Sequence, residues 1–166
     1  MSEVQLPVAA EDLECIGRQL GRTPRGVHRI SHRCPCGNPD VVETVPRLED
    51  GTPFPTLYYA TCPRLTGEIS TLESSGLMAK MNTDLETDVE LVGAYRAAHD
   101  DYLAARAALG IEVPEIAEIS AGGMPNRVKC LHVLVAHSLA AGPGVNPLGD
   151  QALALLPQWW KGKTCE

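Results

Sequence analysis

The sequence is poor in aromatic residues, with one Phe, two Trp and four Tyr among its 166 residues. A core of ordinary size must therefore consist mainly of Leu, Val, Ile and Ala. The hydrophobic fraction is nevertheless 44%, which argues against an intrinsically disordered chain. We expect a single domain over residues 1–166, with an ordered core at 9–157 and a tail at 158–166.

Positive charge is also scarce, because 14 Lys and Arg stand against 21 Asp and Glu, for a net charge of −7. General nucleic-acid binding needs a basic surface that neutralises phosphates, so this balance argues against it. A local basic pocket is still compatible with such a charge.

Long apolar runs are missing as well, and none approaches the roughly 20 residues of a membrane-spanning helix. The N-terminal residues lack the basic and then apolar segments of a signal peptide. We therefore expect a cytoplasmic protein with no membrane partner. Its six cysteines then favour metal binding or redox chemistry over a disulfide framework.

What the sequence does contain is mainly helical periodicity. We predict helices over residues 9–21, 63–74, 77–82, 88–109, 125–141 and 147–156. Short strands are expected over 27–33, 40–48 and 56–62, and Pro46 would confine the second to a sheet edge or end it early. The expected fold class is α+β, mainly helical, with a small two- or three-stranded antiparallel sheet that carries a Cys-Pro-Cys knuckle.

The knuckle Cys34-Pro35-Cys36 places two thiols one residue apart in a turn. Cys62 ends the third predicted strand, and Cys130 falls in the second turn of the predicted helix 125–141. Four thiolates, from Cys34, Cys36, Cys62 and Cys130, would suit either a tetrahedral Zn2+ ion or a 4Fe-4S iron–sulfur cluster.

Two histidines are alternative ligands. His137 follows Cys130 by seven residues and so shares its helix face, whereas His132 could serve only if the helix begins later than predicted. A metal-free protein is also possible, since buried free cysteines behave as small hydrophobic residues. We expect that packing role for Cys15, an inert Cys165 in the tail, and a surface position for His99.

Four basic residues lie within three positions of a candidate ligand: Arg33, Arg64, Arg127 and Lys129. They would either offset the negative charge of a thiolate cluster or line a pocket for a small anion such as a phosphate or a carboxylate. An ordinary solvated surface is the third interpretation.

Two sequence blocks, CPCGNPDVVETVPRLEDGTPFPTLYYATCPRL and GGMPNRVKCLH, carry a family resemblance. The chain resembles the bacterial, mainly actinobacterial, domain of unknown function 501 family over roughly residues 10–155. The resemblance implies a small cytosolic protein, often encoded near enolase, a septum-formation initiator protein and an exopolyphosphatase. Work linked to polyphosphate, nucleotides or cell division is the weak hypothesis that follows, and no cofactor or catalytic residue comes with it.

Two functional hypotheses are left open. In the first, the protein is a metal–thiolate protein with a basic pocket for a small anionic ligand, and an enzyme if that ligand is a phosphorylated or carboxylated substrate. In the second, it is a non-enzymatic interaction module with structural zinc or no metal. That module would dock an unknown protein partner through the acidic helix 88–109.

Overall fold

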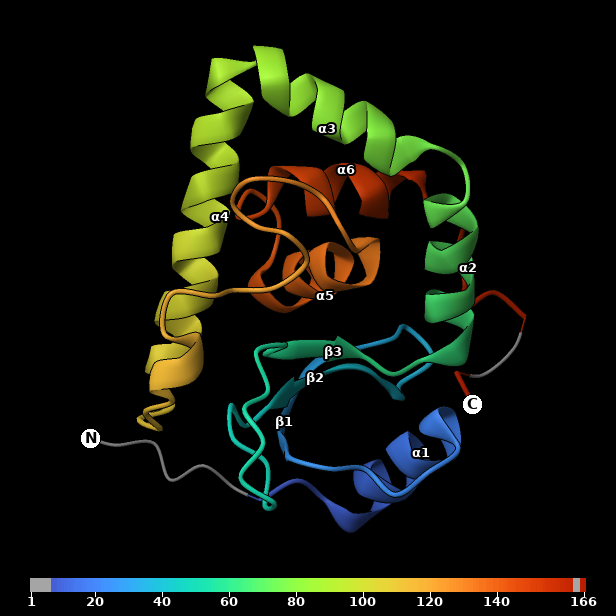
Figure 1. The fold of residues 1–166 in the computed structure, drawn as a ribbon. Helices are drawn as coiled ribbons and strands as arrows, with labels where there is room; N and C mark the ends of the chain where they lie inside the picture. Colours follow the sequence, from blue (N-terminus) through green and yellow to red (C-terminus); the bar gives the residue numbers. More distant parts are fainter. Residues whose placement is uncertain (1–6, 163–164) are drawn as a thin grey trace.

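Three strands and six α-helices make up the fold in the computed structural model, which describes residues 7–162 and 165–166 (Figure 1). The strands are β1 (Val27–Arg33), β2 (Pro39–Thr44) and β3 (Tyr58–Ala60). The helices are α1 (Ala10–Leu20), α2 (Pro63–Glu73), α3 (Leu77–Thr87), α4 (Val89–Ala107), α5 (Leu131–Ala141) and α6 (Pro147–Leu155), with a short 3-10 helix at Pro114–Ile116. The predicted α+β class is confirmed.

The sheet is antiparallel with strand order β1-β2-β3. Its central strand β2 is buried along its whole length. The knuckle forms the turn between β1 and β2, where the Cys34 N–H donates to the Asn38 carbonyl at 2.9 Å and the Gly37 N–H donates to the Cys34 carbonyl at 2.8 Å. Gly37 has φ of 97°, which a residue with a Cβ rarely adopts, so glycine is required there.

Helices cover both faces of this small sheet. The apolar helix α5 lies against one face and α1 lies against the other (Figure 1). Helices α2, α3 and α4 frame α5 on the outside, and α6 packs directly on it (Figure 1). The contact between α5 and α6 depends on Gly149, because a Cβ there would overlap the Leu134 carbonyl group and the Ser138 hydroxyl.

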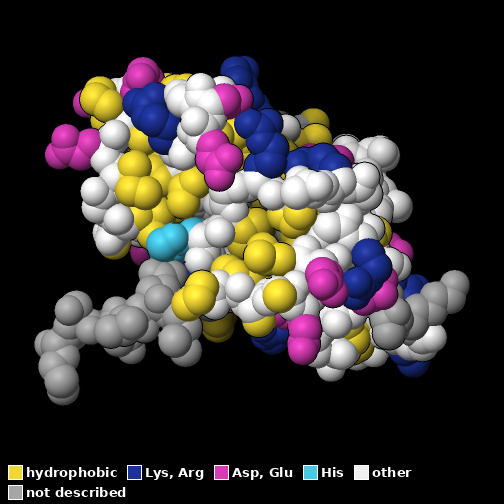
Figure 2. All heavy atoms as spheres, turned by 90° about the horizontal axis from the view of Figure 1, so that it is seen from below, with side chains coloured by type: hydrophobic (Ala, Val, Ile, Leu, Met, Phe, Trp, Pro, Cys, Tyr) yellow, Lys and Arg dark blue, Asp and Glu magenta, His cyan; other side chains and the backbone are white. Residues whose placement is uncertain are grey.

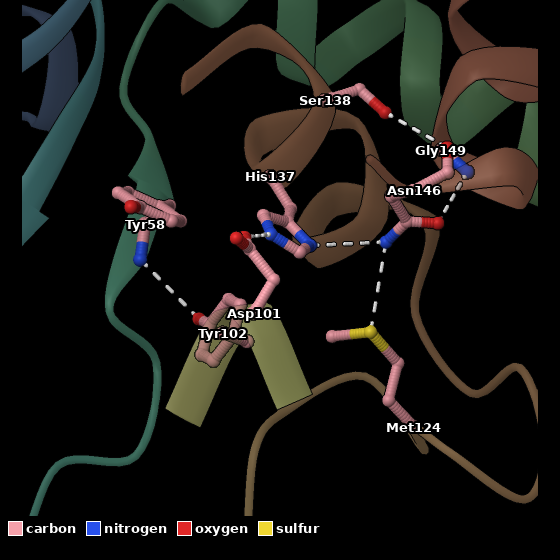
Figure 3. A network of polar contacts seen from close by, with 8 residues as sticks. All are labelled: Tyr58, Asp101, Tyr102, Met124, His137, Ser138, Asn146 and Gly149. Atoms are coloured by element: carbon pink, nitrogen blue, oxygen red, sulfur yellow. Dashed lines mark hydrogen bonds and ion pairs between the residues drawn. The ribbon is translucent and has the colours of Figure 1, made fainter. Parts of the chain in front are cut away.

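A polar network centred on His137 fills the space between α4, α5 and α6 (Figure 3). His137 Nε2 lies 2.9 Å from Asp101 Oδ2, and Asn146 Nδ2 donates to His137 Nδ1 at 3.2 Å. Asn146 in turn accepts from the Gly149 N–H, which caps α6. Burial lowers the pKa of His137, so the ring is neutral and carries its proton on Nε2. His137 therefore has a structural role in the core. It was predicted as an alternative metal ligand, but it belongs to neither group of candidate metal ligands among the described residues.

Helix α5 begins at Leu131, six residues later than predicted. The preceding segment instead forms a loop whose backbone bonds to neighbouring side chains. Tyr95 Oη donates to the Arg127 carbonyl at 2.9 Å, and the Asn82 side chain both accepts from and donates to the backbone of Val128. These tertiary hydrogen bonds satisfy the groups that a longer helix would have paired internally.

One smaller prediction is corrected by the packing. His99 was expected on the surface but is 7% exposed, with its ring 2.7 Å from Ser120 Oγ. Helix α4, the predicted docking helix, buries Tyr95 and Tyr102, while Val89 and Val92 are exposed near its start.

Within the residues that the structure describes, no helix combines the length and the apolar character needed to cross a membrane.

Candidate functional site

Three cysteines converge beside the knuckle. The sulfurs of Cys34, Cys36 and Cys165 all lie within 4.8 Å of one another, and the Cys34 and Cys165 sulfurs are 2.9 Å apart. Cys34 and Cys165 are buried, whereas Cys36 is exposed. The Cys36 N–H also points at Cys34 Sγ, 3.5 Å away, a contact that opposes the effect of burial on this thiol. The group could hold a metal ion.

The C-terminal residues reach the knuckle because α1 holds them there. Gln19 Nε2 donates to the Cys165 carbonyl at 2.6 Å and to the Pro39 carbonyl at 2.7 Å. Arg18 pairs with Glu166 at 2.8 Å. Cys165, which was assigned to the tail, therefore lies beside Cys34 and Cys36. A cysteine near the chain end gives no local signal of what it approaches, which is why sequence reasoning missed it.

Cys62 adjoins the same group from the start of α2. It is fully buried and is the N-cap residue of that helix. Burial raises the pKa of the Cys165 thiol, and the neighbouring thiols of Cys34 and Cys62 raise it further. Cys62 lies in the same buried cluster as Cys34 and Cys165, in the corner where the knuckle meets the start of α2, but its sulfur is not within 4.8 Å of all three grouped sulfurs.

The thiols in this corner differ in their ease of ionisation. Burial raises the pKa of Cys34. At Cys36 burial acts in the same direction, but the Asn38 N–H and the thiols of Cys34 and Cys165 outweigh it, so its pKa is lowered. Several thiolates packed this closely would repel one another, and a bound cation removes that penalty.

Cys130 belongs to a different group. Its sulfur lies within 4.8 Å of ligand atoms of Glu73 and His132, whereas Cys34 and Cys36 group with Cys165. The late start of α5 explains the difference, because it makes Cys130 the N-cap residue and turns His132 towards α2. The sequence allowed His132 to join a site only if the helix began later than predicted, and α5 does begin later. The partners of His132, however, are Cys130 and Glu73. No motif or spacing in the sequence indicated that Glu73 would belong to a site.

The histidine in this second group is held on both sides. His132 Nδ1 lies 2.9 Å from Glu73 Oε1, and His132 Nε2 lies 3.2 Å from the Thr66 carbonyl and 3.3 Å from Ser70 Oγ. The other carboxylate oxygen of Glu73 accepts from the Leu131 N–H at 3.0 Å. The pKa of His132 is raised, first by Cys130 and also by Glu73 against the effect of burial.

Cys130 shows the complementary shift. Burial raises its pKa, but His132 and the Val133 N–H at the start of α5 outweigh this effect, so the pKa of Cys130 is lowered. Cys130 and His132 also line a cavity of about 500 Å³. Another cavity, of about 510 Å³, lies beside Leu103 and Val113, and the residues that line it include no cysteine or histidine.

The four predicted anion-binding residues do not gather in either cavity. Arg33 is bound to Asp12 at 2.6 Å, and the side chains of Arg127 and Lys129 are exposed. Arg64 is partly buried, and its Nη1 has no hydrogen-bond partner among the described residues. On the face shown in Figure 2, acidic and basic side chains are interleaved.

Comparison with known proteins places the chain in a family without assigning it an activity. No curated protein and no solved structure matches it. A family model matches residues 30–154, a segment that contains Cys34, Cys36, Cys62 and the whole Cys130 group but ends before Cys165. Since this segment covers well over half of the sequence, the chain belongs to the family described as "Protein of unknown function (DUF501)".

Proposed function

We propose that this protein binds one zinc ion through Cys34, Cys36, Cys62 and Cys165. The observation that carries the proposal is the convergence of three sulfurs within 4.8 Å, and Cys62, which is buried in the same cluster as Cys34 and Cys165, would complete the set. Cys165 replaces Cys130 in the set that the sequence suggested. The donors are reduced cysteines, and thiolates are the ligands that structural zinc prefers.

The spacing of the sulfurs favours a single ion over a 4Fe-4S cluster. Zn–S bonds of about 2.3 Å in a tetrahedron put the sulfurs about 3.8 Å apart. The three sulfurs lie within 4.8 Å of one another, and Cys34 and Cys165 would have to move apart from 2.9 Å to bind the ion. A 4Fe-4S cluster binds each thiolate to a different iron, so its ligands must stand further apart than those of one ion.

Four protein ligands leave no open coordination position, so the proposed zinc has a structural role. It would hold the β1–β2 turn, the start of α2 and the C-terminal residues together. The zinc would thereby add to the bonds by which Gln19 and Arg18 of α1 hold the C-terminal residues. Four thiolates and one Zn2+ carry a net negative charge. Arg64, which follows Cys62 closely and has an unpartnered guanidinium nitrogen, is the predicted cation best suited to offset it.

The anionic ligand and the cellular location are part of this proposal. A small phosphate or carboxylate would have to recruit Arg127 and Lys129, whose exposed side chains are free to move towards it. A site built from reduced thiols is stable in the cytoplasm, where disulfides are rare, and we infer that the protein acts there.

Elemental analysis of protein purified without oxygen tests the metal proposal. We expect a colourless protein with one zinc per chain, and loss of that zinc in Cys165→Ser and Cys36→Ser. Cys15→Ser is the matched control, because Cys15 is a buried cysteine outside the group and its replacement should leave the zinc content unchanged. A brown protein that contains iron would show that the site holds an iron–sulfur cluster in place of zinc. Metal-free protein would refute the proposal.

A further inference from the structure

The group of Glu73, His132 and Cys130 has an arrangement that the metal proposal leaves unused. The three residues come from the end of α2 and the start of α5. Cys130 and His132 line the cavity of about 500 Å³, and Glu73 contacts His132. A thiol, an imidazole and a carboxylate thus lie within 4.8 Å of one another next to a space that a small molecule can enter.

Hydrogen-bond geometry defines the charge of the imidazole. Glu73 Oε1 faces His132 Nδ1, and the Thr66 carbonyl faces Nε2. Carboxylates and carbonyls are acceptors only, and the Ser70 hydroxyl can accept as well, so all these contacts are satisfied when both ring nitrogens carry a proton. His132 is therefore an imidazolium cation, with neither nitrogen lone pair free to bind a metal. Both oxygens of Glu73 are also engaged, by His132 and by the Leu131 N–H.

This cation lies beside the Cys130 sulfur at the start of a helix of 11 residues. A neighbouring imidazolium and the N–H groups of a helix N-terminus both favour a thiolate over a thiol. The charged groups that face Cys130 are Glu73 from α2 and His132 from α5. Since Glu73 is bonded directly to His132, its negative charge is largely offset before it reaches the sulfur.

The cavity lining indicates what would meet that thiolate. It consists of aromatic, hydroxyl, amide and aliphatic side chains, including Tyr58, Tyr59, Thr56 and Gln19. No Lys, Arg, Asp or Glu belongs to the lining. A charged ligand would therefore have only His132 to pair with, and His132 is already bonded to Glu73. An uncharged molecule fits this lining better.

We propose that Cys130 is a nucleophile that accepts an acyl group from an uncharged ester or thioester bound in this cavity. The Cys130 sulfur forms a bond to the carbonyl carbon, and the bond from that carbon to the leaving oxygen or sulfur breaks. His132 donates a proton to the leaving group. Water then attacks the acyl–cysteine, its proton returns to His132, and a carboxylic acid leaves with regeneration of the thiolate. Glu73 positions His132 throughout.

Acylation by p-nitrophenyl acetate tests this reaction in zinc-loaded protein. We expect release of one p-nitrophenol per chain in the first turnover, together with one acetyl group on the peptide that contains Cys130. Cys130→Ser should abolish both. Cys15→Ser is the control, because Cys15 is a free cysteine that belongs to neither group, and its replacement should leave the labelling of Cys130 intact.

The pH dependence of alkylation separates activation from mere accessibility. Iodoacetamide transfers its carbamidomethyl group to the sulfur with loss of iodide, at a rate that follows the thiolate fraction. We expect His132→Asn to slow this reaction at pH 7 by about 100-fold and Glu73→Gln by about 10-fold. Both variants should recover towards the wild-type rate above about pH 9, where an ordinary cysteine ionises unaided. This recovery shows that a variant is folded and accessible.

Three results would overturn the inference. They are a Cys130 that titrates as an ordinary thiol in the wild type, equal rates in wild type and His132→Asn at pH 7, or acetylation confined to other residues. None of them bears on the zinc centre, whose ligands are different cysteines. The two proposals can therefore fail separately.

Discussion

Replacement of Gly149 by Ala tests the packing that holds the core helix in place. Gly149 lies in α6 where this helix crosses α5, and a Cβ at this position would overlap the Leu134 carbonyl group and the Ser138 hydroxyl. The hydroxyl can rotate away, but the carbonyl belongs to the backbone of α5 and cannot. Helix α6 would have to move outward, which also pulls Asn146 away from His137 Nδ1 on α5.

The expected cost combines three effects. Overpacking of a buried contact typically costs about 1–3 kcal/mol. Weakening the hydrogen bond from Asn146 to His137 adds about 1 kcal/mol, whereas Ala gains up to about 1 kcal/mol over Gly in helix propensity. We therefore expect a net loss of about 1–3 kcal/mol in the free energy of unfolding, or about 2–10 °C in melting temperature for a chain of this size.

Urea denaturation followed by tryptophan fluorescence provides the measurement, since Trp159 is buried in the core. Gly93→Ala in α4 is the matched control, because Gly93 is exposed and a Cβ there has no neighbour within 4 Å. That variant should gain about 0.5–1 kcal/mol. If Gly149→Ala were as stable as Gly93→Ala, the close crossing of α5 and α6 would be wrong.

Four further predictions concern two histidines, a buried arginine and the chain end. The pKa of His137 is lowered in the fold, so its contribution to stability is present above about pH 6.5 and is lost on acidification, and the destabilisation measured for His137→Gln should shrink below that pH. The pKa of His132 is raised, so the destabilisation of His132→Gln should instead shrink as the pH rises through the folded-state pKa. Arg106→Met should lower the free energy of unfolding measured by urea denaturation by at least about 2 kcal/mol, because the buried guanidinium donates to the carbonyls of Pro55 and Ile119 and Met leaves them unpaired. A smaller loss would mean that water bonds these carbonyls in place of the guanidinium. Deletion of residues 165–166 should make thermal stability insensitive to a chelator that destabilises the full chain, and equal sensitivity would exclude Cys165 as a ligand.

Local sequence was a sound guide to the secondary structure and to the knuckle. The strand at 27–33 was predicted with the bounds that the structure shows, and Pro63 begins α2 as expected. Pro46 lies beyond the end of β2 at Thr44, consistent with the limit that a proline sets on a strand. These features depend on propensities and turn chemistry within a few residues, which is the range over which sequence patterns are informative.

The start of α5 shows where such patterns fail. Pro125 is a suitable first helical residue, yet the chain stays in a loop up to Cys130 because side chains of Tyr95 and Asn82 bond its backbone. Helical periodicity does not register partners that are more than 30 residues away. The error then propagates to function, because it moves Cys130 from a helix face to a helix cap and gives His132 a different neighbourhood.

The sequence by itself determined that cysteines would meet at the turn between two strands, since Cys34, Cys36 and the glycine that closes the turn are nearly adjacent in the chain. Only the tertiary structure decided which sulfurs join them. Cys165 arrives because α1 binds the last residues through Gln19 and Arg18, and Cys130 turns to Glu73 and His132 because α2 and α5 pack side by side. The physical reason is that these contacts span many tens of residues, and their geometry is set by the packing of helices on a sheet.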